Sequence, residues 1–177
     1  MNAGKWFAAI VLLQMAFLVG EAAMRQRGLD TGRPLVLRVH PVDPRSLFSG
    51  QYMALGFDAE DIDAAHLPVS ASLKAGSTAY VSFRPDTPYA RVASVESSPS
   101  RFSGVVPLRA TVRWRDGKRL RVDFGMDRYY IPEARQAEVN RLWWNGRQRD
   151  VSALVKVDSK GRGVIEHILV DGKPLPY

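Results

Sequence analysis

The chain contains no cysteine among its 177 residues. This absence excludes a disulfide scaffold, a thiolate zinc centre and a cysteine nucleophile. Histidine is scarce, because the chain has only His40, His66 and His167, which lie far apart without metal-ligand spacing. We therefore expect structural histidines, with no metal and no cofactor. The sequence also lacks a phosphate-binding loop, a dinucleotide fingerprint and a nucleophile elbow.

Negative charge is in deficit, with 25 basic residues against 18 acidic residues and a net charge of +7. Arginine supplies 19 of the basic residues, and these are spread from Arg25 to Arg162 rather than gathered in one run. A scattered pattern is typical of a solvated surface. No nucleic-acid-binding motif is present, so we expect no nucleic-acid partner. Anionic phospholipid head groups beside a membrane anchor are a second interpretation of the excess charge.

One hydrophobic segment is long enough to span a membrane. Residues 6–20 are interrupted only by Gln14, and continuing to Met24 gives nineteen residues. A membrane span needs about 20 residues. Lys5 supplies a positively charged flank in front of the segment, as in a signal sequence or a signal anchor.

We therefore predict a retained signal anchor over residues 1–27 and an exported domain over residues 28–177. The expected location is single-pass in a bacterial inner membrane, with the domain in the periplasm and lipid contacting the N-terminal helix. A cleaved signal peptide is the alternative, because Gly20 and Ala22 are small residues suited to a cleavage site. Arg25, Arg27 and Arg33 follow the span, so the positive charges do not fix the orientation by themselves.

The rest of the chain has mostly strand patterns. The clearest unit is a hairpin over residues 108–125, with apolar residues alternating against arginines on both arms. The pattern predicts that Val112 opposes Val122 and that Trp114 opposes Leu120, with a three-residue connection at 116–118. Trp114 and Phe124 would then lie in the core, and the arginine face would lie in solvent.

Residues 151–158 and 163–170 have the pattern of a last pair of strands, followed by a tight turn at Asp171-Gly172. Pro132 opens a predicted helix that ends near Gly146. The expected fold class is mainly β: an N-terminal transmembrane helix followed by a small antiparallel β-barrel or sandwich domain with one short helix.

Three stretches carry a family resemblance. Pro41-Val-Asp-Pro is followed by Leu47-Phe and then by Gly50-Gln-Tyr-Met-Ala-Leu-Gly-Phe; the other two stretches are residues 128–133 and 155–175. In this order they resemble the signature of the GDYXXLXY family of membrane-anchored proteins. The chain departs from the signature at Gln51, where the family has Asp, and at Phe57, where it has Tyr.

The resemblance implies an exported, anchored domain that is often encoded beside a multi-span membrane protein. A polytopic membrane protein is therefore the expected partner. If the signature Asp were catalytic, Gln51 would be unable to replace it, which argues against catalysis here.

The candidate interaction or motif residues are Asp43, Arg45, Phe48, Gly50, Tyr52, Leu55, Tyr130 and Glu133. Asp43 is interpreted either as a turn stabiliser or, with Arg45, as part of a contact surface. Phe48 either plugs one end of the β core or makes an apolar contact beside the membrane. Tyr52 is expected in the core or at its rim.

Residues 44–55 also loosely resemble the loop-then-strand pattern of type I signal peptidases. By that spacing the nucleophile position is Val42, which has no hydroxyl to activate. The sequence thus favours a non-enzymatic accessory or interaction module for a polytopic membrane partner. The alternatives are an enzyme of undetected type acting on an envelope substrate, or a signal-peptidase-like β fold without the nucleophile.

Overall fold

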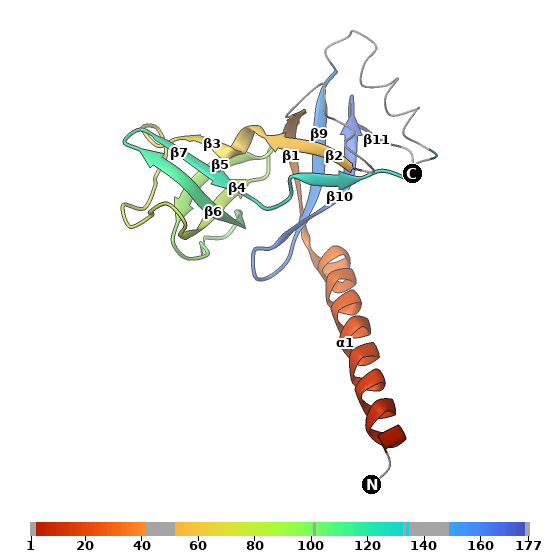
Figure 1. Ribbon diagram of the computed structural model, residues 1–177. Helices are drawn as coiled ribbons and strands as arrows, with labels where there is room; N and C mark the ends of the chain where they lie inside the picture. The colour runs from red at the N-terminus through yellow and green to blue at the C-terminus, as the bar shows by residue number, and fades with distance from the viewer. Residues whose placement is uncertain (1–2, 42–51, 101, 133, 135–148, 176–177) are drawn as a thin grey trace.

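The computed structural model of the chain describes residues 3–41, 52–100, 102–132, 134 and 149–175. Helix α1 (Ala3–Thr31) projects away from the strands (Figure 1). Its segment Gly4–Met24 is long and apolar enough to cross a membrane, and none of that segment is buried. The polar residues of this segment are only Lys5, Gln14 and Glu21, so it has no continuous polar stripe of the kind that marks a helix on the surface of a soluble domain. The helix continues past residue 27, where the sequence places the end of the anchor, to Thr31.

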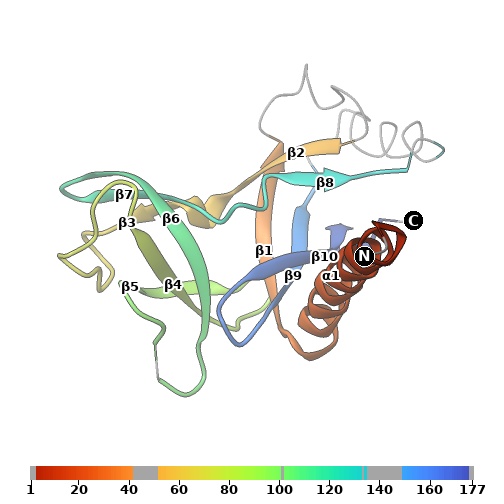
Figure 2. The same cartoon turned by 60° about the horizontal axis from the view of Figure 1, so that its bottom comes forward.

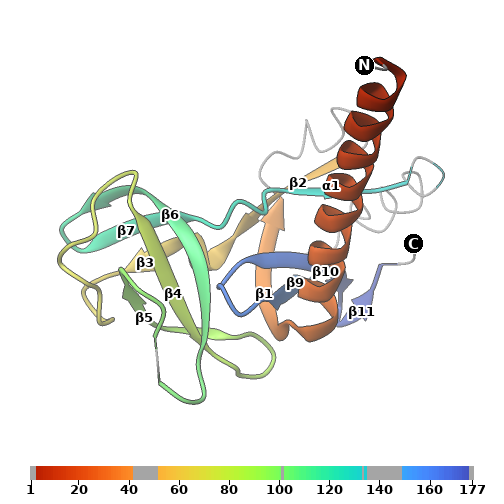
Figure 3. The same cartoon turned by 90° about the horizontal axis from the view of Figure 1, so that it is seen from below.

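The strands after α1 form two antiparallel sheets that together make a curled half-barrel. The six-stranded sheet has the order β11-β10-β9-β1-β2-β8 and the five-stranded sheet the order β3-β7-β6-β4-β5. Figure 3 shows the five-stranded sheet to one side of β1, β9 and β10. The strands of the six-stranded sheet are β1 (Arg33–Pro41), β2 (Tyr52–Phe57), β8 (Arg128–Tyr130), β9 (Val151–Val157), β10 (Gly163–Val170) and β11 (Lys173–Pro174). Those of the five-stranded sheet are β3 (Asp61–Asp63), β4 (Thr78–Arg84), β5 (Arg91–Glu96), β6 (Val106–Asp116) and β7 (Arg119–Asp123), and a 3-10 turn, η1 (Asp58–Glu60), precedes β3. This mainly β architecture after one apolar helix confirms the predicted fold class.

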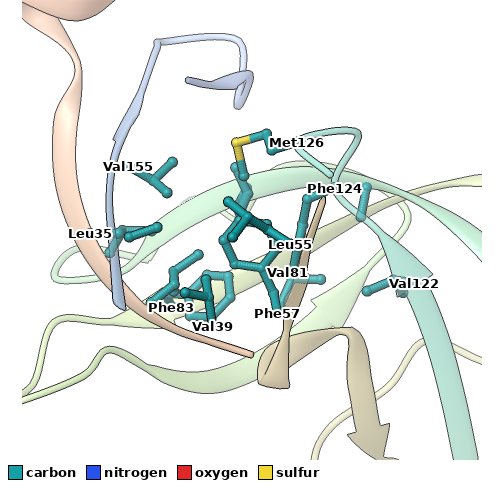
Figure 4. Packing of buried hydrophobic residues seen from close by; sticks show 14 of the residues in the cluster. Leu35, Val39, Leu55, Phe57, Val81, Phe83, Val122, Phe124, Met126 and Val155 are labelled. Carbon is teal, nitrogen blue, oxygen red and sulfur yellow. The ribbon is translucent and has the colours of Figure 1, made fainter. Parts of the chain in front are cut away.

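The two sheets share one apolar core (Figure 4). Apolar side chains at every second position of the strands fill this core, since alternate residues of a strand point to the same face. Phe124 packs against two other core rings: its ring centroid lies 5.8 Å from that of Phe57, in an edge-on arrangement, and 6.1 Å from that of Phe83. Full burial of one such side chain contributes about 1.5–3 kcal/mol. Burial of Phe124 was predicted from the sequence and is confirmed.

The C-terminal strands also follow the predicted pattern. β9 pairs with β10, and β10 pairs with β11 through Leu169 opposite Pro174 and Val170 opposite Lys173. The turn between β10 and β11 has positive φ at both central residues, 51° at Asp171 and 76° at Gly172. This conformation matches the right-handed twist of a hairpin and favours Asp-Gly.

The β6–β7 hairpin corrects one prediction. Val112 opposes Val122 as expected, but the register shifts between Val112 and Trp114. The extra residue of this bulge turns Trp114 to the outer face opposite Arg121, where 42% of the residue is exposed. Trp114 is therefore not a core residue, and its predicted pairing with Leu120 is wrong.

The bulge also shortens the connection. Asp116 pairs with Arg119, so the turn contains two residues, Gly117 and Lys118, instead of the three predicted. The predicted solvent-facing arginine face holds at Arg113, which is exposed and pairs with the carboxylate of Asp123. It is wrong at Arg115, because the bulge puts this residue opposite the buried Leu120, where it is partly buried and donates a hydrogen bond to the Ser70 carbonyl at 2.9 Å. The helix predicted from Pro132 to Gly146 falls mostly outside the described residues.

Candidate interaction face on strands β1, β2 and β8

Two of the three motif stretches become neighbouring strands. β2 and β8 pair antiparallel, with Tyr52 opposite Tyr130 and Ala54 opposite Arg128. The backbone amide of Leu55 also donates a hydrogen bond to the Asp127 carbonyl at 2.9 Å. The fold thus brings together Tyr52, Leu55 and Tyr130, three of the residues that the sequence singled out.

These three residues do not share one role. Leu55 points inward with Met53 and Phe57 and is 2% exposed, so packing explains its place in the motif. Tyr52 and Tyr130 point outward, because paired residues of an antiparallel ladder share a face. Tyr130 is 68% exposed and Tyr52 is half-buried at the rim, as the sequence allowed.

The two tyrosines and Arg128 form an aromatic and cationic cluster. The rings of Tyr52 and Tyr130 lie 6.1 Å apart between centroids and are tilted by 60°. The guanidinium carbon of Arg128 lies 5.3 Å from the centroid of the Tyr52 ring, within reach of a cation–π interaction. The cluster therefore presents two phenol rings and one fixed positive charge.

The outer side of β1 continues this surface with Arg38 and His40. His40 opposes Gly56 across the β1–β2 ladder, and a Cβ atom at Gly56 would lie 2.6 Å from His40 Nε2. Glycine at this position lets the imidazole lie against the β2 backbone. His40 Nδ1 is 2.8 Å from Asp58 Oδ1, and Arg38 Nε is 3.8 Å from Asp58 Oδ2.

Arg38 connects this pair to a second acidic group. Its Nε lies 3.9 Å from Asp150 Oδ1, and its guanidinium carbon lies 5.7 Å from the centroid of the Tyr89 ring. The Tyr89 hydroxyl donates to the Asp150 carboxylate. Burial raises the pKa of Tyr89, and this hydrogen bond raises it further, so the phenol remains a proton donor at neutral pH. A shallow hollow is lined here by Arg38, Pro88, Tyr89, Arg149 and Asp150.

We call this continuous outer surface the β1–β2–β8 face. Its residues are Arg38, His40, Tyr52, Ala54, Gly56, Asp58, Arg128 and Tyr130. Tyrosine and arginine are enriched at the energetic centres of protein–protein interfaces. Between the charged and the aromatic ends, β2 contributes only the small residues Ala54 and Gly56, and the His40 imidazole covers Gly56.

The His40–Asp58 pair has the geometry in which a carboxylate orients an imidazole. A hydrolytic site would also need a nucleophile within hydrogen-bond reach of that imidazole. Within the described ranges, no hydroxyl is hydrogen-bonded to His40, and no three His, Asp or Glu side chains group in a way that could hold a metal ion. What this part of the face offers is a set of charge-assisted hydrogen-bonding groups.

The second exposed histidine has a local partner. His66 Nδ1 lies 2.8 Å from Asp63 Oδ2, and the Ala65 amide donates to Asp63 Oδ1 at 2.9 Å. The Ala65 bond and the His66 bond lower the pKa of the Asp63 carboxyl. This arrangement closes a turn after β3 and fits the structural role expected for His66.

Five candidate residues, Asp43, Arg45, Phe48, Gly50 and Glu133, lie outside the described residues, so their predicted roles stay predictions. Sequence reasoning did not select Arg38, His40 and Asp58. The apolar residues Leu35, Leu37 and Val39 alternate with Val36 and Arg38, and this pattern by itself puts Arg38 on the outer side of its strand. No local pattern predicts that Asp58, Tyr89 and Asp150 approach Arg38, because these residues come from three separate segments.

Comparison with protein families gives a match over most of the chain. The family described as GDYXXLXY protein matches residues 14–168, from within α1 to within β10. That range contains β1, β2 and β8 and therefore every residue of the β1–β2–β8 face. No curated protein and no solved structure matches the chain. Because the match covers most of the sequence, the chain belongs to the GDYXXLXY family.

Proposed function

We propose that this protein is a membrane-anchored, non-enzymatic module of the cell envelope that binds a polytopic membrane protein through the β1–β2–β8 face. One observation carries the proposal. Two motif stretches that are distant in sequence meet as β2 and β8 and place Tyr52, Tyr130 and Arg128 together on the outer surface. Rigid aromatic rings beside an arginine supply contact area and directional hydrogen bonds at a low cost in side-chain entropy.

The position of the anchor supports a partner in the same bilayer. α1 ends at Thr31 and β1 begins at Arg33, with only the buried Gly32 between them. So short a connection keeps the domain at the membrane surface. Confinement near a membrane partner raises its effective concentration, so a face of modest size is sufficient for binding. A retained anchor in the inner membrane and a periplasmic domain belong to the same proposal, and the Lys5 flank supports them.

Catalysis is the competing function, and the His40–Asp58 pair is the observation that favours it. Both side chains are about half exposed, at 50% each, so solvent screens them. A catalytic base is usually held in a water-excluded site where its pKa is tuned. Binding through Tyr52 and Tyr130 needs no acid–base group. Gln51, which stands where the family signature has Asp, agrees with binding rather than catalysis.

Site-specific photo-crosslinking in cells tests the proposal with the full-length chain. A photoreactive amino acid at position 130 should crosslink to one polytopic membrane protein. The Tyr52→Ala and Arg128→Ala substitutions should each reduce the yield by about tenfold or more, as expected when a central interface residue is removed.

The matched control is the same photoreactive residue at position 114, an exposed tryptophan on the other sheet. It should not give this crosslink. Equal products from positions 114 and 130, or a product at position 130 that is insensitive to Tyr52→Ala, would contradict the proposal. A His40→Ala variant that loses a measurable envelope function while keeping the position-130 crosslink would favour the enzymatic alternative.

A further inference from the structure

Basic residues from three segments lie near the point where α1 joins the β domain, and one of them, Arg33, donates a hydrogen bond from Nη1 to the Val105 carbonyl at 2.7 Å. Arg33, the first residue of β1, pairs with Val157 at the end of β9, and Val157 also pairs with Gly163 at the start of β10. The turn between β9 and β10 therefore returns to the end of the anchor. Figures 1 and 2 show this turn beside the C-terminal end of α1.

We define the basic collar as Arg27 of α1, Arg33 of β1, and Lys160 and Arg162 of the β9–β10 turn. All four residues are exposed. Two acidic residues lie among them: Asp30, which accepts a hydrogen bond from Gln26 at 3.0 Å, and Asp158, which lies 2.7 Å from Arg162 Nε. The collar thus has an excess of positive charge over negative charge.

Hydrogen bonds brace the turn from both sides. The Asp158 Oδ1 atom accepts hydrogen bonds from the backbone amides of Lys160 and Arg162, both at 2.8 Å. Desolvation acts to raise the pKa of Asp158, but the hydrogen bonds from Arg162 and Lys160 outweigh it, so that the pKa is lowered and the carboxylate stays ionised. The Gly161 carbonyl also accepts a hydrogen bond from the Arg109 backbone amide at 2.7 Å, and this bond joins the turn to β6.

The collar has the right height for lipid head groups. The span ends at Met24 and the helix at Thr31, seven residues later, which is about 10 Å along a helix axis. The head-group layer occupies roughly the first 5–8 Å beyond the hydrocarbon core. Long basic side chains reach across the remaining gap, which is within a Debye length of about 8 Å at physiological ionic strength.

We propose that the basic collar binds anionic phospholipid head groups around the point where α1 leaves the bilayer. This inference rests on the proposed membrane anchoring of α1. A second attachment beside the helix limits the tilt of the domain, because a single helix and a buried glycine alone would allow the domain to rock. The β1–β2–β8 face is thereby presented to its partner in a restricted orientation.

Spin-label accessibility tests the collar in the full-length chain. Because the chain has no cysteine, Ser159→Cys gives a unique labelling site at the exposed tip of the turn. The labelled protein is reconstituted in vesicles of phosphatidylcholine alone or of phosphatidylcholine with phosphatidylglycerol. The label should be sheltered from a water-soluble nickel chelate only when phosphatidylglycerol is present.

The charge variant Lys160→Gln/Arg162→Gln should expose the label in both kinds of vesicle. Each removed charge should weaken docking by roughly fivefold, as for basic residues next to anionic membranes. Arg113→Gln/Lys118→Gln removes the same charge from the β6–β7 hairpin and should leave the label sheltered. If both double variants expose the label equally, the effect comes from net charge alone, and the proposal that the basic collar binds lipid head groups is overturned.

A second label, at Leu12→Cys, separates this inference from the anchoring proposal. Oxygen accessibility should place that label in the hydrocarbon core. If Leu12 is in the core while position 159 is equally exposed, or equally sheltered, in both kinds of vesicle, the collar proposal alone is overturned. A Leu12 label in water would overturn the anchoring proposal together with the collar.

Discussion

The Glu60 carboxylate lies mostly buried beside β7. Its Oε2 atom is 3.8 Å from Arg121 Nη2, and its Oε1 atom is 3.5 Å from the Phe124 amide nitrogen. Burial raises the pKa of Glu60 above its ordinary value of 4.5, and the Phe124 hydrogen bond and the Arg121 charge do not fully offset it. The folded state therefore binds this proton more tightly than the unfolded chain does. Stability from this group is present below pH 4.5 and is lost as the pH rises through the folded-state pKa.

We expect Glu60→Gln to raise the midpoint of thermal unfolding at pH 7, because the neutral amide avoids the cost of a buried charge. The difference from the wild type should shrink as the pH falls below about 4.5, where the carboxyl is protonated in both states. Melting curves at pH 4 and pH 7 measure this. A variant less stable than the wild type at pH 7 would mean that the Arg121 pair outweighs burial.

A side chain at Gly163 would press on two buried side chains, Leu108 and Met126, which would have to shift. A Cβ atom there would lie 2.7 Å from Leu108 Cδ1 and 2.8 Å from Met126 Sδ. Gly163→Ala should therefore cost about 1–3 kcal/mol in the free energy of unfolding, as for overpacked cores. Denaturant titration of the full chain in detergent measures it.

Gly20→Ala is the matched control for Gly163→Ala, since a Cβ atom at Gly20 meets no atom within 4 Å. It should leave the unfolding of the β domain unchanged. Equal effects of the two substitutions would mean that the β10 start is not packed against Leu108 and Met126.

At the scale of elements, the β6–β7 bulge decides which aromatic residue stabilises the hairpin. Trp114→Ala should cost about 1 kcal/mol or less, because the bulge leaves the side chain on the outer face. Phe124→Ala should cost about 3–5 kcal/mol, because it opens a cavity between Phe57 and Phe83. Denaturant unfolding of the two variants gives the comparison.

Arg113→Ala is the control on the same hairpin and should stay within about 0.5 kcal/mol, since exposed ion pairs contribute little. A cost for Trp114→Ala as large as that for Phe124→Ala would mean that the hairpin keeps the unbulged register.

At the scale of the whole molecule, the orientation and retention of α1 determine where the β domain works. A C-terminal alkaline phosphatase fusion should be active, because that enzyme folds only after export to an oxidising compartment. The protein should stay with the membrane fraction after a carbonate wash, since the segment Gly4–Met24 is long and apolar enough to cross a bilayer core. An inactive fusion would reverse the topology, and release by carbonate would indicate cleavage or peripheral attachment.

The sequence by itself determined the features that depend on near neighbours. The helix that could cross a membrane is an apolar run interrupted only by Gln14 over residues 6–20. The inward residues Leu35, Leu37 and Val39 follow from strand alternation, and the Asp171-Gly172 pair favours its own tight turn. Each is encoded within a few residues, so local rules are sufficient to find it. Tyr52 and Tyr130 were selected through the family resemblance, and the structure places both on one face.

Only the tertiary structure decided how distant segments meet. No local pattern marks the bulge that turns Trp114 outward or the pairing of β2 with β8. The same is true of the cluster in which Asp58, Tyr89 and Asp150 approach Arg38. The same holds for the basic collar, which is built from α1, β1 and the β9–β10 turn. The physical reason is that register and convergence are set by the sum of many contacts between residues far apart in the chain, whereas a sequence pattern reports only which way each side chain points within its own strand.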